Sequence, residues 1–207
     1  MQNRRPTVNK LTSRRQFLGH CGLFTGGVAV GVLASSWLSS STIPQATAEE
    51  TPLHNAEAQL KKLGLKLPAT SKPTATYVPT VAVGGILYVA GHGPRYPDGR
   101  SFVGKLGQDL DLEKGQLAAR LAGLRILASV REALGSLDKV VRVVKTLGMV
   151  NATPDFTQHS QVINGCSDLM VEVFGKSAGT GARSAVGMSS LPGGIPVEIE
   201  MVFQIQP

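Results

Sequence analysis

The stretch that decides the fold is Val197-Glu198-Ile199-Glu200-Met201-Val202-Phe203-Gln204-Ile205, close to the end of the chain. Apolar residues alternate here with Glu198, Glu200 and Gln204, a pattern typical of a strand with one buried face and one open face. Val202 falls on the open face with these polar residues, which gives a mixed surface suited to a wet cleft between subunits. The stretch therefore predicts a sheet that is covered on one side.

Four further strands are expected where apolar, largely β-branched residues are bounded by glycine or proline. The first two form a hairpin, because Gly84-Gly85 tolerates the positive φ that a two-residue turn requires. The third is apolar on both faces, as a central strand is. These strands are predicted over residues 77–83, 86–90, 139–150 and 182–190.

Two helices are expected between these strands. The first, over 113–134, has aliphatic residues at steps of three and four, with Asp111 as its N-cap and Gly135 after its end. The second runs over 160–174 and stops before Gly175. The order ββαβαββ predicts an α/β (α+β) two-layer sandwich, with two helices packed on one mixed sheet. The aliphatic stripe of the first helix is Leu117, Leu121, Leu124, Leu127, Val130 and Leu134, and its expected solvated residues are Arg120, Arg125 and Arg131.

The first 48 residues have the features of an export signal. Arg14-Arg15 precedes a weakly apolar stretch over 22–38, and Ala46-Thr47-Ala48 supplies a small-x-small cleavage site. We expect a twin-arginine signal peptide over 1–48, contact with the membrane only through this segment, and a periplasmic or secreted location. An uncleaved membrane anchor is the alternative, which the glycines and serines of the stretch disfavour.

Two segments are expected after the signal. Residues 49–76 form a lead-in with a short helix within 56–65, broken by Pro68 and Pro73. Residues 77–207 form the domain.

Charge and cysteine content limit the class of function. The chain has 21 basic and 14 acidic residues, but five basic residues lie within 1–48, so the excess falls from +7 to +2 after cleavage. No nucleic-acid partner is expected, and a ribonuclease gains little support. Cys166 remains without a disulfide partner and is expected to be a buried, inert thiol. No metal or other cofactor is expected, since His54, His92 and His159 lack paired ligand spacing.

Arg183 lies in a small-residue strand, and two carboxylates lie in the strand that follows it. One interpretation is a structural ion pair with Glu198 or Glu200. The other is an arginine that binds a substrate carboxylate through two parallel hydrogen bonds. The residue types alone favour the ion pair over the carboxylate-binding arginine.

The run Ala182-Arg183-Ser184-Ala185-Val186, followed by Leu191-Pro192 and Val197-Glu198-Ile199-Glu200, resembles the C-terminal signature of the Rid family. This family (reactive intermediate deaminase) is also called YjgF-like or endoribonuclease L-PSP-like. The hairpin over 77–91 resembles the family's first hairpin, and the resemblance covers about residues 54–206. Two further runs match in the same order, Gly104-Lys105-Leu106-Gly107 with Asp109-Leu110, and Val162-Ile163-Asn164-Gly165.

The resemblance implies a chorismate-mutase-like fold, a homotrimer, and ligand clefts between subunits. It implies hydrolysis of 2-aminoacrylate-type enamines or imines to 2-keto acids and ammonia, without a cofactor. Arg183 would hold the substrate carboxylate, Glu198 would lie near the attacking water, and Tyr77 and Asn164 would line the cleft. Ala185 stands where many deaminases of the family carry cysteine. Non-catalytic binding of a small carboxylate metabolite in the same cleft is the alternative.

Overall fold

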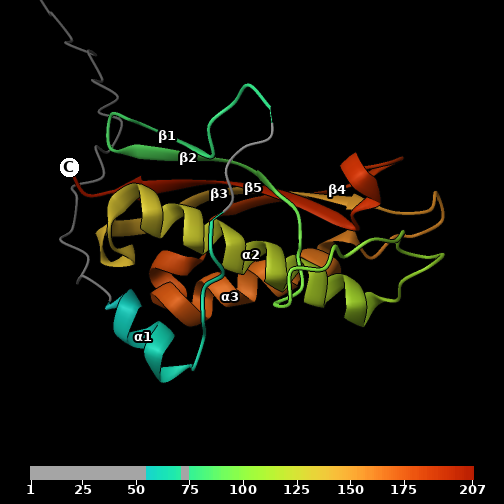
Figure 1. Ribbon diagram of the computed structural model, residues 1–207, viewed down its shortest axis with the longest axis horizontal. Helices are drawn as coiled ribbons and strands as arrows, with labels where there is room; N and C mark the ends of the chain where they lie inside the picture. The colour runs from blue at the N-terminus through green and yellow to red at the C-terminus, as the bar shows by residue number, and fades with distance from the viewer. Residues whose placement is uncertain (1–54, 71–74) are drawn as a thin grey trace, which may run out of the picture. The chain divides into compact units, whose positions relative to one another are not determined.

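The computed structural model describes residues 55–70 and 75–207 (Figure 1). The predicted signal peptide lies outside the described residues. Within them, none of the helices combines the length and hydropathy needed to cross a membrane. The elements are α1 (Ala56–Lys62), β1 (Thr80–Val83), β2 (Ile86–His92), α2 (Leu112–Leu134), β3 (Val140–Asn151), α3 (His159–Gly179), β4 (Ala182–Met188) and β5 (Val197–Ile205), with 3-10 turns at Leu137–Lys139 and Pro192–Gly194.

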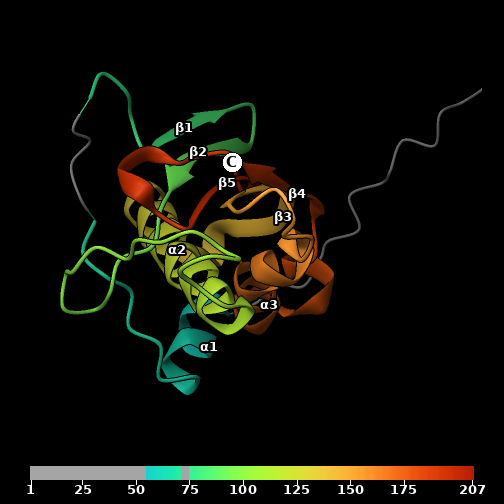
Figure 2. The ribbon, with the colours of Figure 1, turned by 90° about the vertical axis from the view of Figure 1, so that its right-hand side faces the viewer.

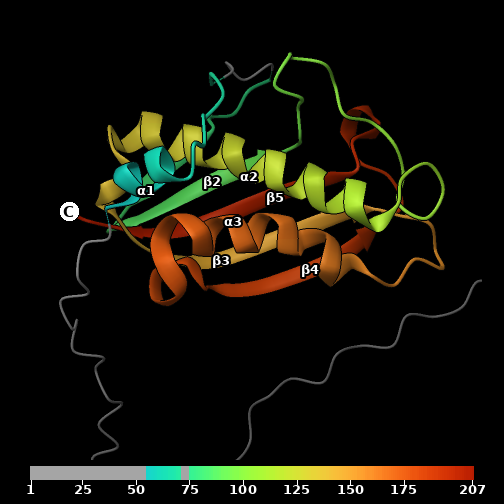
Figure 3. The same cartoon turned by 90° about the horizontal axis from the view of Figure 1, so that it is seen from below.

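The five strands form one mixed sheet in the order β1-β2-β5-β3-β4 (Figure 3). Neighbouring strands are antiparallel, except that β3 and β4 are parallel. The last strand of the chain therefore lies in the middle of the sheet, and β3 separates it from β4. All three helices lie on one side of the sheet (Figures 1 and 2), so the predicted two-layer sandwich is confirmed.

The two faces of β5 have the environments that its alternation predicts. Val197, Ile199, Met201 and Phe203 are buried against the helices. Glu198, Glu200, Val202 and Gln204 occupy the other face and are half-buried or exposed. No helix of the described chain covers that face (Figure 2).

The buried face of α2 differs from the predicted leucine stripe. Leu117 is 45% exposed, and Leu121 and Leu124 are only partly buried. Small residues instead let α2 approach α3 closely: a Cβ at Gly123 would lie 2.9 Å from Leu169 Cδ2, and one at Gly165 would collide with the backbone of α2. The fully buried residues of α2 include Ala118, Ala119, Ala122, Ile126, Leu127 and Val130.

The three arginines of α2 are also not the solvated face that the spacing predicts. Arg120 makes a bidentate ion pair with Glu172 of α3, at 2.7 and 3.0 Å. Arg131 lies 3.2 Å from a carboxylate oxygen of Glu57. Arg125 donates to the carbonyl oxygen of Gly93 at 2.7 Å. Each arginine thus ties α2 to a neighbouring element.

Helix α1, in the described part of the lead-in, contributes to the same core as the sheet. Asn55 caps α1 by accepting from the backbone N–H of Ala58 at 2.9 Å, and Ala56 and Leu60 are almost fully buried. Glu57 accepts from the backbone N–H of Leu137 at 3.1 Å, which joins α1 to the end of α2. The helix stops at Lys62, three residues earlier than the pattern predicts.

Several element ends also differ from the prediction. The β1 strand begins after Pro79, which has no N–H to donate, rather than at Tyr77. The helix preceding β4 is interrupted where predicted, at Gly175, whose φ of 77° is non-helical, although a further turn continues to Gly179. Gly84 and Gly85 both have positive φ, as the hairpin turn requires.

Candidate functional site

The first group of predicted site residues surrounds Arg183 at the β4 edge of the sheet. The Arg183 guanidinium donates through one nitrogen to Asn164 Oδ1 at 2.8 Å and to Ser167 Oγ at 3.1 Å. Both acceptors project from α3, and the three side chains border a cavity of about 250 Å³. We call Arg183, Asn164 and Ser167 the arginine group. Its guanidinium is exposed and held in one orientation, as carboxylate binding requires.

The second group surrounds Glu198, in the centre of the sheet. The Glu198 carboxyl group lies directly on Gly91 of β2, where a Cβ would collide with Oε1. Burial raises the Glu198 pKa, and repulsion from Glu200 raises it further. A carboxyl group with a raised pKa exchanges protons closer to neutral pH, so it suits general acid–base chemistry.

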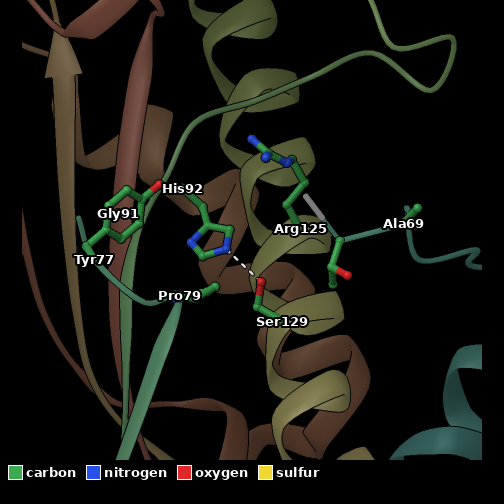
Figure 4. Close-up of a pocket in the computed structure, with 8 residues that line it drawn as sticks. Ala69, Tyr77, Pro79, Gly91, His92, Arg125 and Ser129 are labelled. Atoms are coloured by element: carbon green, nitrogen blue, oxygen red, sulfur yellow. Dashed lines mark hydrogen bonds between the residues drawn. The ribbon is translucent and has the colours of Figure 1, made fainter. Parts of the chain in front are cut away.

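Tyr77 lies with this second group. Tyr77, Gly91 and His92 border a small cavity of about 40 Å³, together with Arg125 and Ser129 of α2 (Figure 4). Gly91 is therefore shared: one side touches the Glu198 carboxyl group and the other borders this cavity. We call Tyr77, Gly91 and Glu198 the glutamate group.

Arg183 and Glu198 lie on opposite faces of the sheet. Arg183 pairs with Thr146 of β3, and Glu198 pairs with Met149 of the same strand. Positions 146 and 149 are separated by an odd number of residues with no bulge between them, so their side chains face opposite ways. Thr146 is buried beneath the helices, whereas Met149 faces the open side.

This register corrects the ion-pair interpretation. Strand β3 lies between β4 and β5, so Arg183 is not a neighbour of Glu198 or Glu200. Among the described residues, Arg183 has hydrogen bonds to an amide and a hydroxyl and no salt bridge to a carboxylate.

The structure gives no chemical role to the remaining residues singled out from the sequence. Ala185 lies two residues beyond Arg183 on the helix-facing side of β4, opposite Gly148, and is partly buried. Cys166 is fully buried, and burial raises the pKa of its thiol to about 12 despite the opposing charge of Arg183. It is the inert thiol expected. In residues 55–70 and 75–207, no group of three or more His, Cys, Asp or Glu side chains is placed to hold a metal ion.

Three polar residues at these groups were not predicted from the sequence. Ser167 follows Asn164 by three positions, a helical spacing that predicts a shared face. His92 and Ser129 form a hydrogen bond of 2.8 Å although they are 37 residues apart in the sequence, and no local sequence pattern predicts such a pair.

Comparison with known proteins gives relatives that match most of the chain. It is 43% identical over 148 residues to Protein TCP17 of Trypanosoma cruzi, covering 72% of this chain and 92% of that protein. It is 41% identical to Atu1372 of Agrobacterium tumefaciens, of unknown function, whose crystal structure matches with a TM-score of 0.66 over 73% of this chain and 94% of that one.

A crystal structure from Shewanella oneidensis MR-1, described as "a putative endoribonuclease", matches with a TM-score of 0.70 at 28% identity. The match covers 73% of this chain and 100% of that one. Residues 57–192 match the family described as "YjgF/chorismate_mutase-like, putative endoribonuclease", which is the family that the C-terminal signature resembles. The chain therefore belongs to the YjgF/chorismate mutase-like family.

Proposed function

We propose that this protein hydrolyses enamines and imines of the 2-aminoacrylate type to 2-keto acids and ammonia, in clefts between the subunits of a homotrimer. Family membership supports a deaminase-like or small-molecule-binding role. The observation that carries the finer proposal is the Arg183 guanidinium, which Asn164 and Ser167 hold in place without a carboxylate partner among the described residues. With the predicted twin-arginine signal, the reaction would take place outside the cytoplasm.

The chemistry needs little beyond orientation and a proton carrier. An enamine first takes a proton at its terminal carbon and loses one from nitrogen to become the imine, whose C=N carbon is electrophilic. Water adds to that carbon and its proton passes to nitrogen, which gives a carbinolamine. The hydroxyl proton then also passes to nitrogen, and ammonia leaves as the C=O bond forms. Arg183 would hold the substrate carboxylate, and Glu198, with its raised pKa, would take the proton from water and return it to nitrogen.

A second chain would complete the site. One small substrate cannot touch both groups of the same chain, because Arg183 and Glu198 lie on opposite faces of the sheet. The uncovered face carries a groove of about 510 Å³ lined by Val81, Tyr88 and Val202, among others. Val81 and Tyr88 are each about half exposed, and a second copy of the chain on this face would bury their side chains. Three copies around one axis would form three equivalent clefts.

A coupled assay tests this function. A dehydratase generates 2-aminoacrylate from serine, and its decay is followed with and without the protein. We expect faster decay with the wild type and a loss of about 30-fold or more in Arg183→Ala, because a bidentate charged contact contributes about 2–3 kcal/mol. Arg100→Ala is the matched control, since Arg100 is exposed and contacts nearby Asp98 and the Tyr96 ring, neither of which belongs to the arginine group.

The binding alternative gives a different result. It predicts no acceleration by the wild type, but saturable binding of a 2-keto acid that Arg183→Ala abolishes. If Arg183→Ala changes neither rate nor binding, both interpretations of the cleft are wrong.

A further inference from the structure

The pairing of β2 with β5 is interrupted beside Glu198. Val89 pairs with Met201 and His92 pairs with Ile199, so three steps along β2 match two steps along β5. One extra residue is therefore accommodated at Ala90–Gly91, which defines a β-bulge. Bulges re-aim the backbone locally and occur preferentially beside active sites.

The bulge forms one wall of the Glu198 environment. The Glu198 carboxyl group lies against Gly91 so closely that no side chain fits there. This contact removes water from the carboxyl group, and burial is the larger of the two causes that raise the Glu198 pKa. Movement of the bulge would therefore change both the position and the protonation of Glu198.

His92 ends the bulge and is held at both ring nitrogens. Nδ1 lies 2.7 Å from the carbonyl oxygen of Ala90, and Nε2 lies 2.8 Å from Ser129 Oγ (Figure 4). A carbonyl oxygen only accepts, so Nδ1 carries the proton; in the neutral ring Nε2 then accepts from the Ser129 hydroxyl. Burial lowers the His92 pKa by more than the hydrogen bond to Ala90 raises it, and the charge of Arg125 lowers it further, which favours this neutral form.

Ser129 gives the histidine a rigid support. It is 7% exposed and sits in the buried face of α2, which packs against α3, β5 and β2. The other titratable groups that line this cavity are Arg125, also from α2, and Tyr77, from the residues before β1. Arg95, from the loop after β2, adds positive charge near Arg125.

We propose that His92 is a positioning residue, which bonds at once to Ala90 and to Ser129 and so fixes the Ala90–Gly91 bulge against the carboxyl group of Glu198. Its effect on catalysis rests on the proposed deaminase function, whereas its effect on the Glu198 environment does not. A nucleophilic Ser129 activated by His92 is a poor alternative, because Ser129 is buried in the middle of a helix.

The test compares His92→Leu, His92→Gln and Ser129→Ala in the full-length protein, with His159→Gln as control. His159 is a histidine of α3 that contacts Phe156 and Gly187, away from the bulge. Two quantities are measured: the Glu198 pKa, by NMR titration of carboxyl-labelled glutamate, and kcat and KM for 2-aminoacrylate decay across pH.

We expect His92→Leu and Ser129→Ala to lower the Glu198 pKa toward its ordinary value and to move the acid limb of the pH–rate profile the same way. We also expect kcat to fall about tenfold or more, with a smaller change in KM, because misplacement of a reacting group acts on the chemical step. The His92→Leu/Ser129→Ala double variant should lose no more than the worse single variant. His92→Gln, whose amide can replace part of both hydrogen bonds, should recover part of the loss.

The two proposals can fail separately. A Glu198 pKa that stays at its wild-type value in folded His92→Leu or folded Ser129→Ala overturns the positioning role. If the wild type does not accelerate 2-aminoacrylate decay, the deaminase proposal fails, and the Glu198 titration still decides the role of His92. Should His92→Leu not fold, Ser129→Ala carries the same test.

Discussion

Glu198 bears a free-energy cost that its surroundings impose. Contact with Gly91 and proximity to Glu200 both disfavour its charged form, so the folded protein holds this proton more tightly than the unfolded chain does. Stability is therefore lost as the pH rises from the ordinary value of 4.5 through the raised pKa. Such costs are typical of residues retained for function.

The variant Glu198→Gln should remove this cost. We expect its thermal unfolding midpoint to exceed that of the wild type at neutral pH, and the two to converge below about pH 4, where both side chains are neutral. Exposed Glu132→Gln serves as control and should not change the midpoint. A lower midpoint for Glu198→Gln at neutral pH would show that the carboxylate stabilises the fold and would contradict the account.

Residue types identified some site residues and missed others for physical reasons. The placement of charge near the chain end singled out Arg183, Glu198 and Glu200, whereas the choice of Glu198 and the roles of both residues came from the resemblance to the Rid family. The separation of Arg183 from the two glutamates was not predictable in this way. Their strands are consecutive in the chain and so suggest neighbours, whereas β3 lies between β4 and β5 in the sheet. The His92–Ser129 bond joins a strand to a helix, so only the packed structure reveals it.

At the scale of elements, helix packing depended on small residues that a hydrophobic pattern underrates. The spacing located α2 to within one residue, with Asp111 as cap and Gly135 as stop. It failed to identify the buried face, because Gly115, Gly123 and Gly165 allow a close α2–α3 contact that leaves Leu117 outside. The sequence therefore predicted that α2 is a helix, while the face that α2 buries depended on its contact with α3.

Helix α1 also belongs to the packed core, which makes a prediction for Leu60. Leu60 is 2% exposed and Leu63, one turn later, is 39% exposed. We expect Leu60→Ala to lower the free energy of unfolding by about 2–4 kcal/mol and the matched Leu63→Ala by less than about 1 kcal/mol. Urea unfolding monitored by circular dichroism measures both. Equal small effects would mean that α1 does not contribute to the stability of the domain.

At the scale of the whole molecule, the sheet separates the two halves of the proposed site. Its helix-covered side carries the arginine group and its open side carries Glu198. The predicted two-layer architecture is confirmed, and the strand order and register are the reason why the proposed chemistry would need more than one chain. The sequence pattern of β5 indicated an open face, but the separation of the groups depends on β3 pairing with both of its neighbours.

The most direct test of this account mixes two variants, Arg183→Ala and Glu198→Gln, each expected to be inactive alone. If every cleft takes Arg183 from one chain and Glu198 from another, random co-assembly of equal amounts should restore about a quarter of the wild-type 2-aminoacrylate hydrolysis. Native mass spectrometry establishes that subunits have mixed and counts the chains, with three expected. Activity near one quarter of wild type is the predicted result. Fully mixed oligomers that remain inactive, or single variants that keep wild-type activity, would contradict a site built from Arg183 and Glu198 of different chains.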